Sequence, residues 1–267
     1  MIGFELLRAA PRTGRGLFHA LAELGGARTA PPRDARDAAH RLAAALGAIA
    51  RAHDIGVTVC GDVPRGCALV VANHVSYLDP LAILPVCPAA PLAKAQVRAW
   101  PIVGAIGAAL GVTFVARDDA MARARALRRV RALLAAGVSV LNFPEGTTTH
   151  GDRVRPFHRG CFGIAQRLGV PVVPVAIRYR DPALAWCDDA AFLPHYVKMA
   201  ARSRVDVELQ FGAAMPPRTG ELAEDMAARA RNAITRMLRG HDATGRARIS
   251  PSRSDAVLPA ARLARAG

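Results

Sequence analysis

A histidine and an aspartate stand five residues apart in the stretch VANHVSYLDP, residues 71–80. A neutral imidazole that is held by a carboxylate can act as a general base. On a regular helix a separation of five turns two side chains well apart, because each residue advances roughly 100°. His74 and Asp79 can therefore meet only across a break in secondary structure. The alternative is a helix-capping aspartate beside a hydrogen-bonded loop histidine.

The residues around this pair predict such a break. The apolar run ALVVA, residues 68–72, is typical of a buried strand, and Asn73 and His74 follow it directly. Asp79 and Pro80 suit the N-cap and the first turn of a helix. Ligands of open α/β sheets gather at the carboxyl ends of strands, so we expect His74 to lie at such an end.

The stretch NFPEGTTTHG, residues 142–151, also follows an apolar, strand-like run. Pro144, Glu145 and Gly146 predict a turn. Gly146 and the three threonines at residues 147–149 offer backbone N–H groups and hydroxyls, which together can cradle a phosphate. Glu145 is unusual beside an anion, so we expect it to accept a hydrogen bond from a substrate hydroxyl or to orient an arginine. An ordinary strand-ending turn with threonine caps is the alternative.

Two further stretches carry weaker signals. Arg117 follows the strand-like residues 111–116, where a guanidinium can bind a phosphate with two hydrogen bonds. A salt bridge to a neighbouring aspartate is the alternative for this arginine. Pro171 and Pro174 stand three residues apart in an apolar run, which favours a sheet edge or a wall that cannot donate hydrogen bonds.

Strand-like and helix-like segments alternate along most of the chain. Strands are expected over residues 57–60, 68–72, 111–116, 139–143, 170–179 and 205–211. Helices are expected over residues 37–55, 120–136, 162–168 and 221–238, and a short one begins at residue 79. This alternation predicts a single α/β domain with a mixed, mostly parallel central sheet flanked by helices, and a site at the carboxyl ends of its strands.

The two ends of the chain differ from this main domain, which we place at residues 36–239. Residues 1–35 are basic and predict one or two amphipathic helices that either lie on a membrane or dock on the protein. Residues 240–267 have the composition of a disordered basic tail. The uncharged run at residues 99–116 contains a proline and three glycines, so we interpret it as a buried helix and a strand rather than a membrane span.

The composition limits the classes of partner. The formal net charge is +15, and all but two of the 36 basic residues are arginines, which favours anionic partners such as phospholipid or an acidic carrier protein. A non-enzymatic basic protein that binds a membrane or nucleic acid is the lower alternative. Nucleic acid is disfavoured, because aromatic residues make up only 5% of the chain and offer no stacking platform. Five cysteines without a C-x-x-C pair indicate a reducing compartment and no zinc or other metal site.

Four motifs stand in the order N-H-x-x-x-x-D, G-V-x-F-x-x-R, F-P-E-G-T and V-P-V-V-P-V between residues 56 and 211. This order resembles the lysophospholipid and glycerolipid acyltransferases, whose best-known members are the 1-acylglycerol-3-phosphate O-acyltransferases. The resemblance implies a membrane-associated enzyme at the cytoplasmic face, on an anionic lipid surface. It would move a fatty acyl group from acyl-CoA or acyl carrier protein to a lysolipid hydroxyl, without a further cofactor. Phosphatidic acid is the simplest product, and a lyso-ornithine-type aminolipid is an alternative acceptor.

The resemblance also implies roles for single residues. His74 would deprotonate the acceptor hydroxyl, and Asp79 would orient His74 and stabilise its charged form. Contacts with the glycerol phosphate of the acceptor are implied for Arg117, Glu145 and Gly146, with Thr147 as an addition, and contacts with the acyl chain for Pro171 and Pro174. The chain departs from the family at His158 and Arg159, where many members have Phe-Lys. A serine hydrolase is disfavoured, because no G-x-S-x-G sequence is present.

Overall fold

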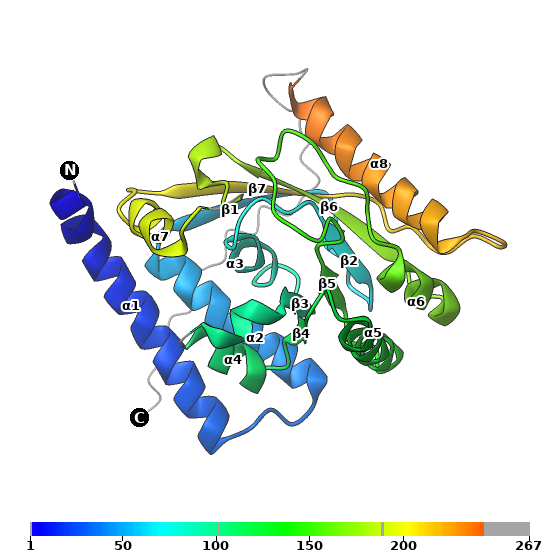
Figure 1. Cartoon of the computed structure of the whole chain (residues 1–267), viewed down its shortest axis with the longest axis horizontal. Helices are drawn as coiled ribbons and strands as arrows, with labels where there is room; N and C mark the ends of the chain where they lie inside the picture. The colour runs from blue at the N-terminus through cyan, green and yellow to red at the C-terminus, as the bar shows by residue number, and fades with distance from the viewer. Residues whose placement is uncertain (1, 101, 188–189, 243–267) are drawn as a thin grey trace, which may run out of the picture.

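The computed structural model describes residues 2–100, 102–187 and 190–242. A seven-stranded sheet in the order β1-β7-β6-β2-β5-β3-β4 runs through the middle of the molecule, and helices lie on both of its faces (Figure 1). All neighbouring strands are parallel except β6 and β7, which are antiparallel. The predicted α/β fold with a mixed, mostly parallel sheet is confirmed.

The strands follow the predicted pattern with one addition. They are β1 (Ile55–Cys60), β2 (Leu69–Ala72), β3 (Ala90–Lys94), β4 (Thr113–Val115), β5 (Val140–Asn142), β6 (Val172–Tyr179) and β7 (Val205–Phe211). Strand β3, with the sequence APLAK, was not predicted, because a proline and a lysine interrupt its apolar pattern. Its pairing with β4 on one side and β5 on the other makes it a strand.

Eight α-helices connect these strands in the described part of the chain. They are α1 (Ile2–Thr29), α2 (Ala35–Ala52), α3 (Asp79–Ile83), α4 (Val103–Ala109), α5 (Ala120–Ala135), α6 (Gly160–Leu168), α7 (Phe192–Ala200) and α8 (Ala223–Asp242). Two short 3₁₀ segments span Ala95–Ala99 and Pro182–Leu184. Helix α7 was not predicted. Gly169 ends α6 in the left-handed conformation, with φ of 67°, which glycine adopts without a steric penalty.

Strand β2 lies at the centre of the core and is fully buried. Val70 and Ala72 face the layer that holds α2, α3, α4 and α7, whereas Leu69 and Val71 face α5, α6 and α8. Because both faces of the strand are covered, its sequence is a continuous apolar run rather than an alternating one. The residues that follow β2 therefore extend from a rigid element.

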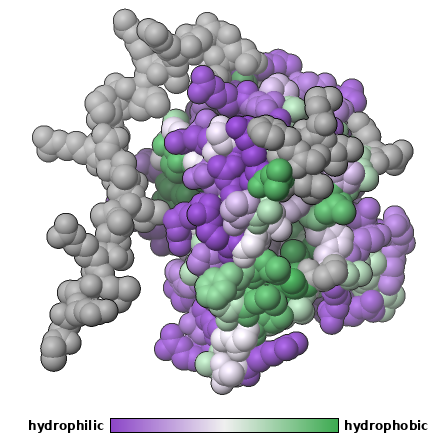
Figure 2. Space-filling view, turned by 90° about the vertical axis from the view of Figure 1, so that its left-hand side faces the viewer, coloured by the Kyte–Doolittle hydropathy of each residue, from purple (hydrophilic) through white to green (hydrophobic). Residues whose placement is uncertain are grey.

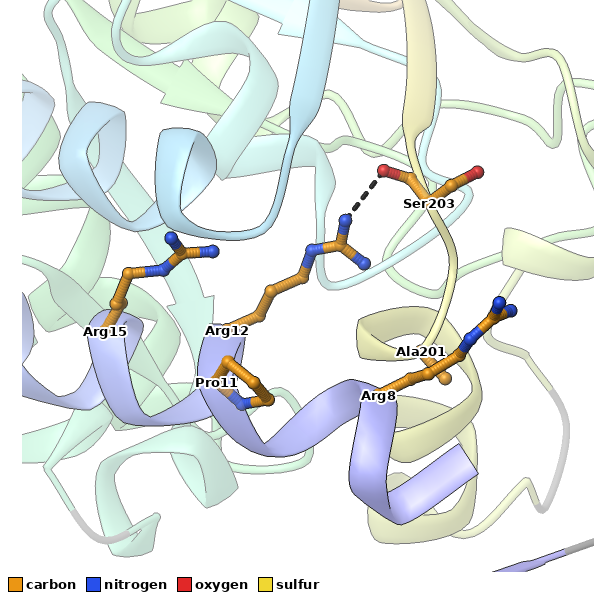
Figure 3. A pocket seen from close by; sticks show the side chains of 6 residues that line it. All are labelled: Arg8, Pro11, Arg12, Arg15, Ala201 and Ser203. Carbon is orange, nitrogen blue, oxygen red and sulfur yellow. Dashed lines mark hydrogen bonds between the residues drawn. The ribbon is translucent and has the colours of Figure 1, made fainter. Parts of the chain in front are cut away.

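Helix α1 is one continuous helix that packs against α2, α4 and α7. The Arg12 guanidinium anchors it. One of its nitrogens donates to the carbonyl of Ser203 at 2.8 Å, as Figure 3 shows, and also contacts the Asp54 carboxylate at 2.8 Å. The guanidinium also donates to the carbonyls of Ala200, the last residue of α7, and of Arg202 just past it. These carbonyls lack partners within their own helix, so Arg12 satisfies the end of α7.

Residues 99–116 form the end of a 3₁₀ segment, helix α4 and strand β4 around the undescribed residue 101, as the sequence predicted. No helix among the described residues is both long and apolar enough to span a lipid bilayer. The prediction of a disordered tail over residues 240–267 lies mainly outside the described residues, since α8 continues to Asp242.

Candidate active site

His74 and Asp79 lie against each other at the carboxyl end of β2. His74 stands two residues beyond the strand, and Asp79 is the first residue of α3. The Nδ1 atom of His74 is 2.7 Å from Oδ2 of Asp79. A carboxylate only accepts, so Nδ1 carries the proton and Nε2 is left with a lone pair. The pair meets across the break between strand and helix, in the arrangement of a general base and its orienting acid.

Asp79 is fully buried, and each of its carboxylate oxygens is hydrogen-bonded. Oδ2 also accepts the N–H groups of Val75 at 2.8 Å and Ser76 at 3.1 Å. The helix N-cap is Leu78 rather than Asp79, so the predicted capping role is wrong: the carboxylate turns back toward the residues that precede the helix. These bonds make the burial of an ionised carboxylate tolerable and fix its position beside the imidazole.

Tyr179 completes the surroundings of Asp79, and sequence reasoning missed it. Its hydroxyl donates to Oδ1 of Asp79 at 2.7 Å. Burial, and to a smaller extent the charge of Asp79, raises the pKa of the Tyr179 hydroxyl well above its usual value, so the hydroxyl keeps its proton and remains a donor. The only signal in the sequence is its place as the last residue of β6, a strand parallel to β2.

The imidazole of His74 rests on the ring of Phe143, which follows β5. The two ring centroids are 4.2 Å apart and the planes are within 19° of parallel. The His74 side chain is 18% exposed, so a substrate can reach a ring whose other side is supported. Asn73 fixes the backbone just before it. The Asn73 amide group donates to the carbonyl of Ile177 at 3.0 Å and accepts the N–H of the same residue at 2.8 Å.

Glu145 ties the FPEGT loop to His74. Its Oε1 accepts the backbone N–H of His74 at 2.9 Å, and its Oε2 accepts the backbone N–H of Arg155 at 2.8 Å. Burial raises the pKa of the Glu145 carboxyl, while these two N–H donors act against that rise. Thr149 adds a further link, because its N–H donates to the carbonyl of His74 at 2.8 Å. The loop therefore positions the backbone of the base.

Arg117, Gly146 and His158 converge on one side of this loop. Gly146 has φ of 77°, and a Cβ atom placed there would lie 2.9 Å from Nε2 of His158 and 4.0 Å from a nitrogen of Arg117. Burial lowers the pKa of the half-buried Arg117 guanidinium. Of the two neighbouring aspartates, Asp119 contacts Arg125 and caps α5, while Asp118 attracts the Arg117 guanidinium without forming an ion pair within 4 Å among the described residues. A side-chain-free glycine between two nitrogen-bearing groups suits an anionic group of a substrate.

Thr147 does not contact His74, Asp79 or Glu145 through a hydrogen bond among the described residues. It is exposed, and within the described residues no hydrogen bond joins it to the site. Thr149, two residues later, makes the contact with His74 instead. The sequence does not predict which of the three threonines at residues 147–149 faces His74, because that depends on the backbone conformation of the loop.

The sheet-edge interpretation of Pro171 and Pro174 is wrong. Strand β6 lies between β7 and β2. The Pro171 carbonyl accepts the N–H of Leu69 at 3.0 Å, and the Pro174 carbonyl accepts the N–H of Gly212 at 2.8 Å. A proline keeps its acceptor, so β6 can be an interior strand. Pro171 lies one position before the start of β2, roughly 13 Å from the carboxyl end of that strand at about 3.3 Å a residue, whereas Pro174 lies level with Val71, one residue from that end.

The described residues contain no group of three or more histidine, cysteine, aspartate or glutamate side chains placed to hold a metal ion. None of the five cysteines, which all lie within the described residues, forms a disulfide.

Comparisons with known proteins agree with this arrangement. The family model described as Acyltransferase matches residues 55–178, which include all eight site residues predicted from the sequence. Lyso-ornithine lipid O-acyltransferase of Pseudomonas aeruginosa is 35% identical over 189 residues, which are 69% of this chain and 72% of that protein. The 1-acyl-sn-glycerol-3-phosphate acyltransferase of Neisseria gonorrhoeae is 37% identical over 143 residues, 52% of this chain and 55% of that protein.

A solved structure shares the fold. The crystal structure of the 1-acyl-sn-glycerophosphate (LPA) acyltransferase PlsC from Thermotoga maritima superimposes with a TM-score of 0.62 at 23% identity, covering 90% of this chain and 100% of that one. The family match, the extent of the relatives and the shared fold lead to one conclusion. The chain belongs to the acyltransferase family that includes the lyso-ornithine lipid and 1-acyl-sn-glycerol-3-phosphate acyltransferases, and it is an acyltransferase of the lysolipid type.

Proposed function

We propose that this enzyme transfers a fatty acyl group from an acyl thioester to the free hydroxyl of a lysolipid, with His74 as the general base. The observation that carries the proposal is the contact of 2.7 Å between His74 Nδ1 and the buried Asp79 carboxylate. It leaves Nε2 as the proton acceptor on a partly exposed ring. The donor is acyl-CoA or acyl carrier protein.

The reaction needs one proton transfer in each direction. Nε2 of His74 takes the proton of the acceptor hydroxyl as its oxygen attacks the thioester carbonyl. The new C–O bond forms, the C–S bond breaks, and the leaving thiolate takes the proton back from the imidazolium. Asp79 stabilises the imidazolium in between. Ser76 cannot serve as a covalent nucleophile, because its side chain is fully buried, so attack on the thioester is direct.

The groups beside Gly146 favour an anionic acceptor. Arg117 and His158 present their nitrogen-bearing groups toward this glycine, and the nearby Asp118 stabilises the charged form of Arg117 without an ion pair within 4 Å among the described residues. The simplest such acceptor is 1-acylglycerol-3-phosphate, which would give phosphatidic acid. A lyso-ornithine lipid is the second candidate, and the longer match to the Pseudomonas aeruginosa relative favours it.

Replacing Arg117 separates these two acceptors. Arg117→Ala is expected to raise KM for 1-acylglycerol-3-phosphate by about tenfold or more, because it removes charge-assisted hydrogen bonds worth about 1.5–3 kcal/mol. Steady-state kinetics with both acceptors would measure the change. Arg125→Ala is the matched control, since the Arg125 side chain is 61% exposed and pairs with Asp119 rather than with the FPEGT loop. An unchanged KM for the phosphate-bearing acceptor would point to an acceptor without a phosphate.

The proposed function itself is tested by supplying the protein with radiolabelled acyl-CoA or acyl carrier protein and a panel of lysolipids. Label in a diacyl lipid is the expected result. The proposal fails if the thioester stays intact with every lysolipid, or if the label appears only as free fatty acid.

We further propose that the enzyme works on an anionic lipid surface at the cytoplasmic face of a membrane. Large apolar side chains are exposed on α1, α4 and α7; this apolar face consists of Leu7, Leu17, Phe18, Leu21, Val103 and Leu193. Figure 2 shows apolar residues gathered on the side of the molecule that carries α1. Trp100 and Phe192, the first residue of α7, pack with ring centroids 4.5 Å apart. Exposed apolar side chains beside tryptophan and basic residues suit a membrane interface.

Polar substitutions on this face are expected to weaken membrane binding. Phe18→Ser combined with Leu21→Ser should lower the affinity for anionic liposomes about tenfold or more, because each apolar side chain contributes about 1.5–3 kcal/mol when buried. Liposome sedimentation would measure the change. Met121→Ser with Leu222→Ser is the control pair, because both side chains are exposed and lie outside the apolar face. Equal losses in the two pairs would contradict the proposal.

A further inference from the structure

A second group of basic residues lies outside the candidate active site. A groove of about 600 Å³ runs between α5, α6 and the start of α8. Its size is typical of a pocket for a small molecule. Four arginines and two glycines form much of its lining: Arg128, Arg131, Arg159, Arg167, Gly160 and Gly163.

The groove holds an excess of positive charge. Arg159 pairs with Glu224 of α8. Arg128, Arg131 and Arg167 contact no carboxylate within ion-pair distance among the residues that the structure describes. Three guanidinium groups without carboxylate partners around one groove favour a ligand that carries several negative charges close together, because each can form paired hydrogen bonds with a phosphate.

The start of α6 adds to this charge. Helix α6 begins at Gly160, which lines the groove, and its N-cap residue Arg159 supplies no side-chain hydrogen bond to the first turn. The first N–H groups of a helix have no partners within it and carry the positive end of its dipole, which attracts phosphate. Glycine at this position also lets α5 approach, since a Cβ atom there would lie 3.1 Å from Leu127.

The groove adjoins the candidate active site along the chain. His158, whose N–H donates to the carbonyl of Pro144 in the FPEGT loop at 2.9 Å, immediately precedes Arg159 and Gly160 in the groove wall. A ligand bound in the groove by its phosphates could therefore extend a flexible arm over His158 toward His74. This is the relation that a thioester donor needs if its charged end is separate from its reacting carbonyl.

We propose that this groove binds the phosphate groups of a nucleotide-bearing acyl thioester, of which acyl-CoA is the example, and so forms the donor site. The inference rests on the proposed function. Coenzyme A carries a pyrophosphate and a further phosphate on its nucleotide, joined to the thiol by an uncharged arm. A carrier protein would instead spread its charge over a large surface, since protein interfaces bury about 800 Å² on each partner. The compact groove favours the nucleotide.

Calorimetric binding of coenzyme A to the full chain, without an acceptor, tests the proposal. Arg131→Glu and Arg167→Glu are each expected to raise Kd by about tenfold or more, the loss expected from removing a charge-assisted hydrogen bond. Arg129→Glu is the matched control, because Arg129 is exposed on the same helix but does not line the groove. It should change Kd by less than about twofold. Pantetheine, which lacks phosphates, should not compete.

Circular dichroism would show whether the glutamate variants are folded. The alanine variants of Arg131 and Arg167 remove the same guanidinium groups without adding a negative charge. An equal effect of Arg129→Glu would overturn the proposal, since general charge would then explain binding. Binding of acyl carrier protein but not of coenzyme A would overturn it in favour of an acidic protein. Coenzyme A binding that depends on the groove supports it even if no lysolipid is acylated, which would refute only the proposed function. If the enzyme acylates a lysolipid from acyl-CoA but the groove variants bind coenzyme A with an unchanged Kd, only the assignment of the groove as the donor site would be refuted.

Discussion

His74→Ala is expected to lower kcat for acyl transfer by about 10²- to 10⁴-fold, the usual contribution of a general base. The substitution removes Nε2, the proton acceptor that the contact with Asp79 defines. The fold should persist, because Asn73 and Glu145 hold this segment through bonds that do not involve the imidazole. Asp79 also keeps three other donors.

Steady-state kinetics with a saturating thioester would measure this loss, and liposome binding should stay at the wild-type level. The matched control is His40→Ala, which makes the same substitution at an exposed position on α2. Turnover of the His74 variant within a few-fold of wild type would contradict the proposed mechanism.

Asp79→Asn is expected to produce a loss of about 10³- to 10⁴-fold in kcat, the scale seen when a buried orienting aspartate becomes an amide. An amide N–H₂ group can donate to Nδ1 of His74, which moves the ring proton to Nε2 and blocks the base. The neutral amide also stabilises the imidazolium less. Because the N–H groups of Val75 and Ser76 and the hydroxyl of Tyr179 point at this carboxylate, stability should also fall, by about 1–3 kcal/mol.

Urea unfolding beside the kinetics separates the two effects. Tyr179→Phe is the control, because it removes a single donor to Oδ1 of Asp79 and leaves the contact with His74 intact. Its kcat should fall by less than about tenfold. If the Tyr179 and Asp79 variants lose activity equally, packing around the carboxylate rather than the state of the imidazole controls catalysis.

The parts of the site that the sequence predicted depend on local signals. The run at residues 68–72 is apolar throughout because β2 is buried on both faces, and this marks the strand that ends before His74. The same reasoning places Arg117 and the FPEGT loop at the carboxyl ends of β4 and β5. Strand ends and turns follow from neighbouring residues, so they can be read without knowledge of the rest of the fold.

The parts that the sequence did not predict depend on distant residues. Tyr179 is 100 positions from Asp79 in the chain, and the Glu145 carboxylate reaches a backbone N–H 71 positions away. The pattern of residues within one segment cannot reveal such contacts, because they follow from the order of strands in the sheet. Strand β3 was missed because its pairing, rather than its composition, makes it a strand. The sheet-edge interpretation of Pro171 and Pro174 was wrong because the carbonyls of both prolines still accept hydrogen bonds from neighbouring segments.

One measurement tests the central claim most directly. Wild-type protein and His74→Ala, matched in melting temperature, would each be given a labelled acyl thioester with 1-acylglycerol-3-phosphate and, separately, with lyso-ornithine lipid. The products would be identified by mass. The expected result is a labelled diacyl lipid from the wild type that is lost in the variant. Formation of the same labelled lipid by the variant at a near wild-type rate would contradict His74 as the base.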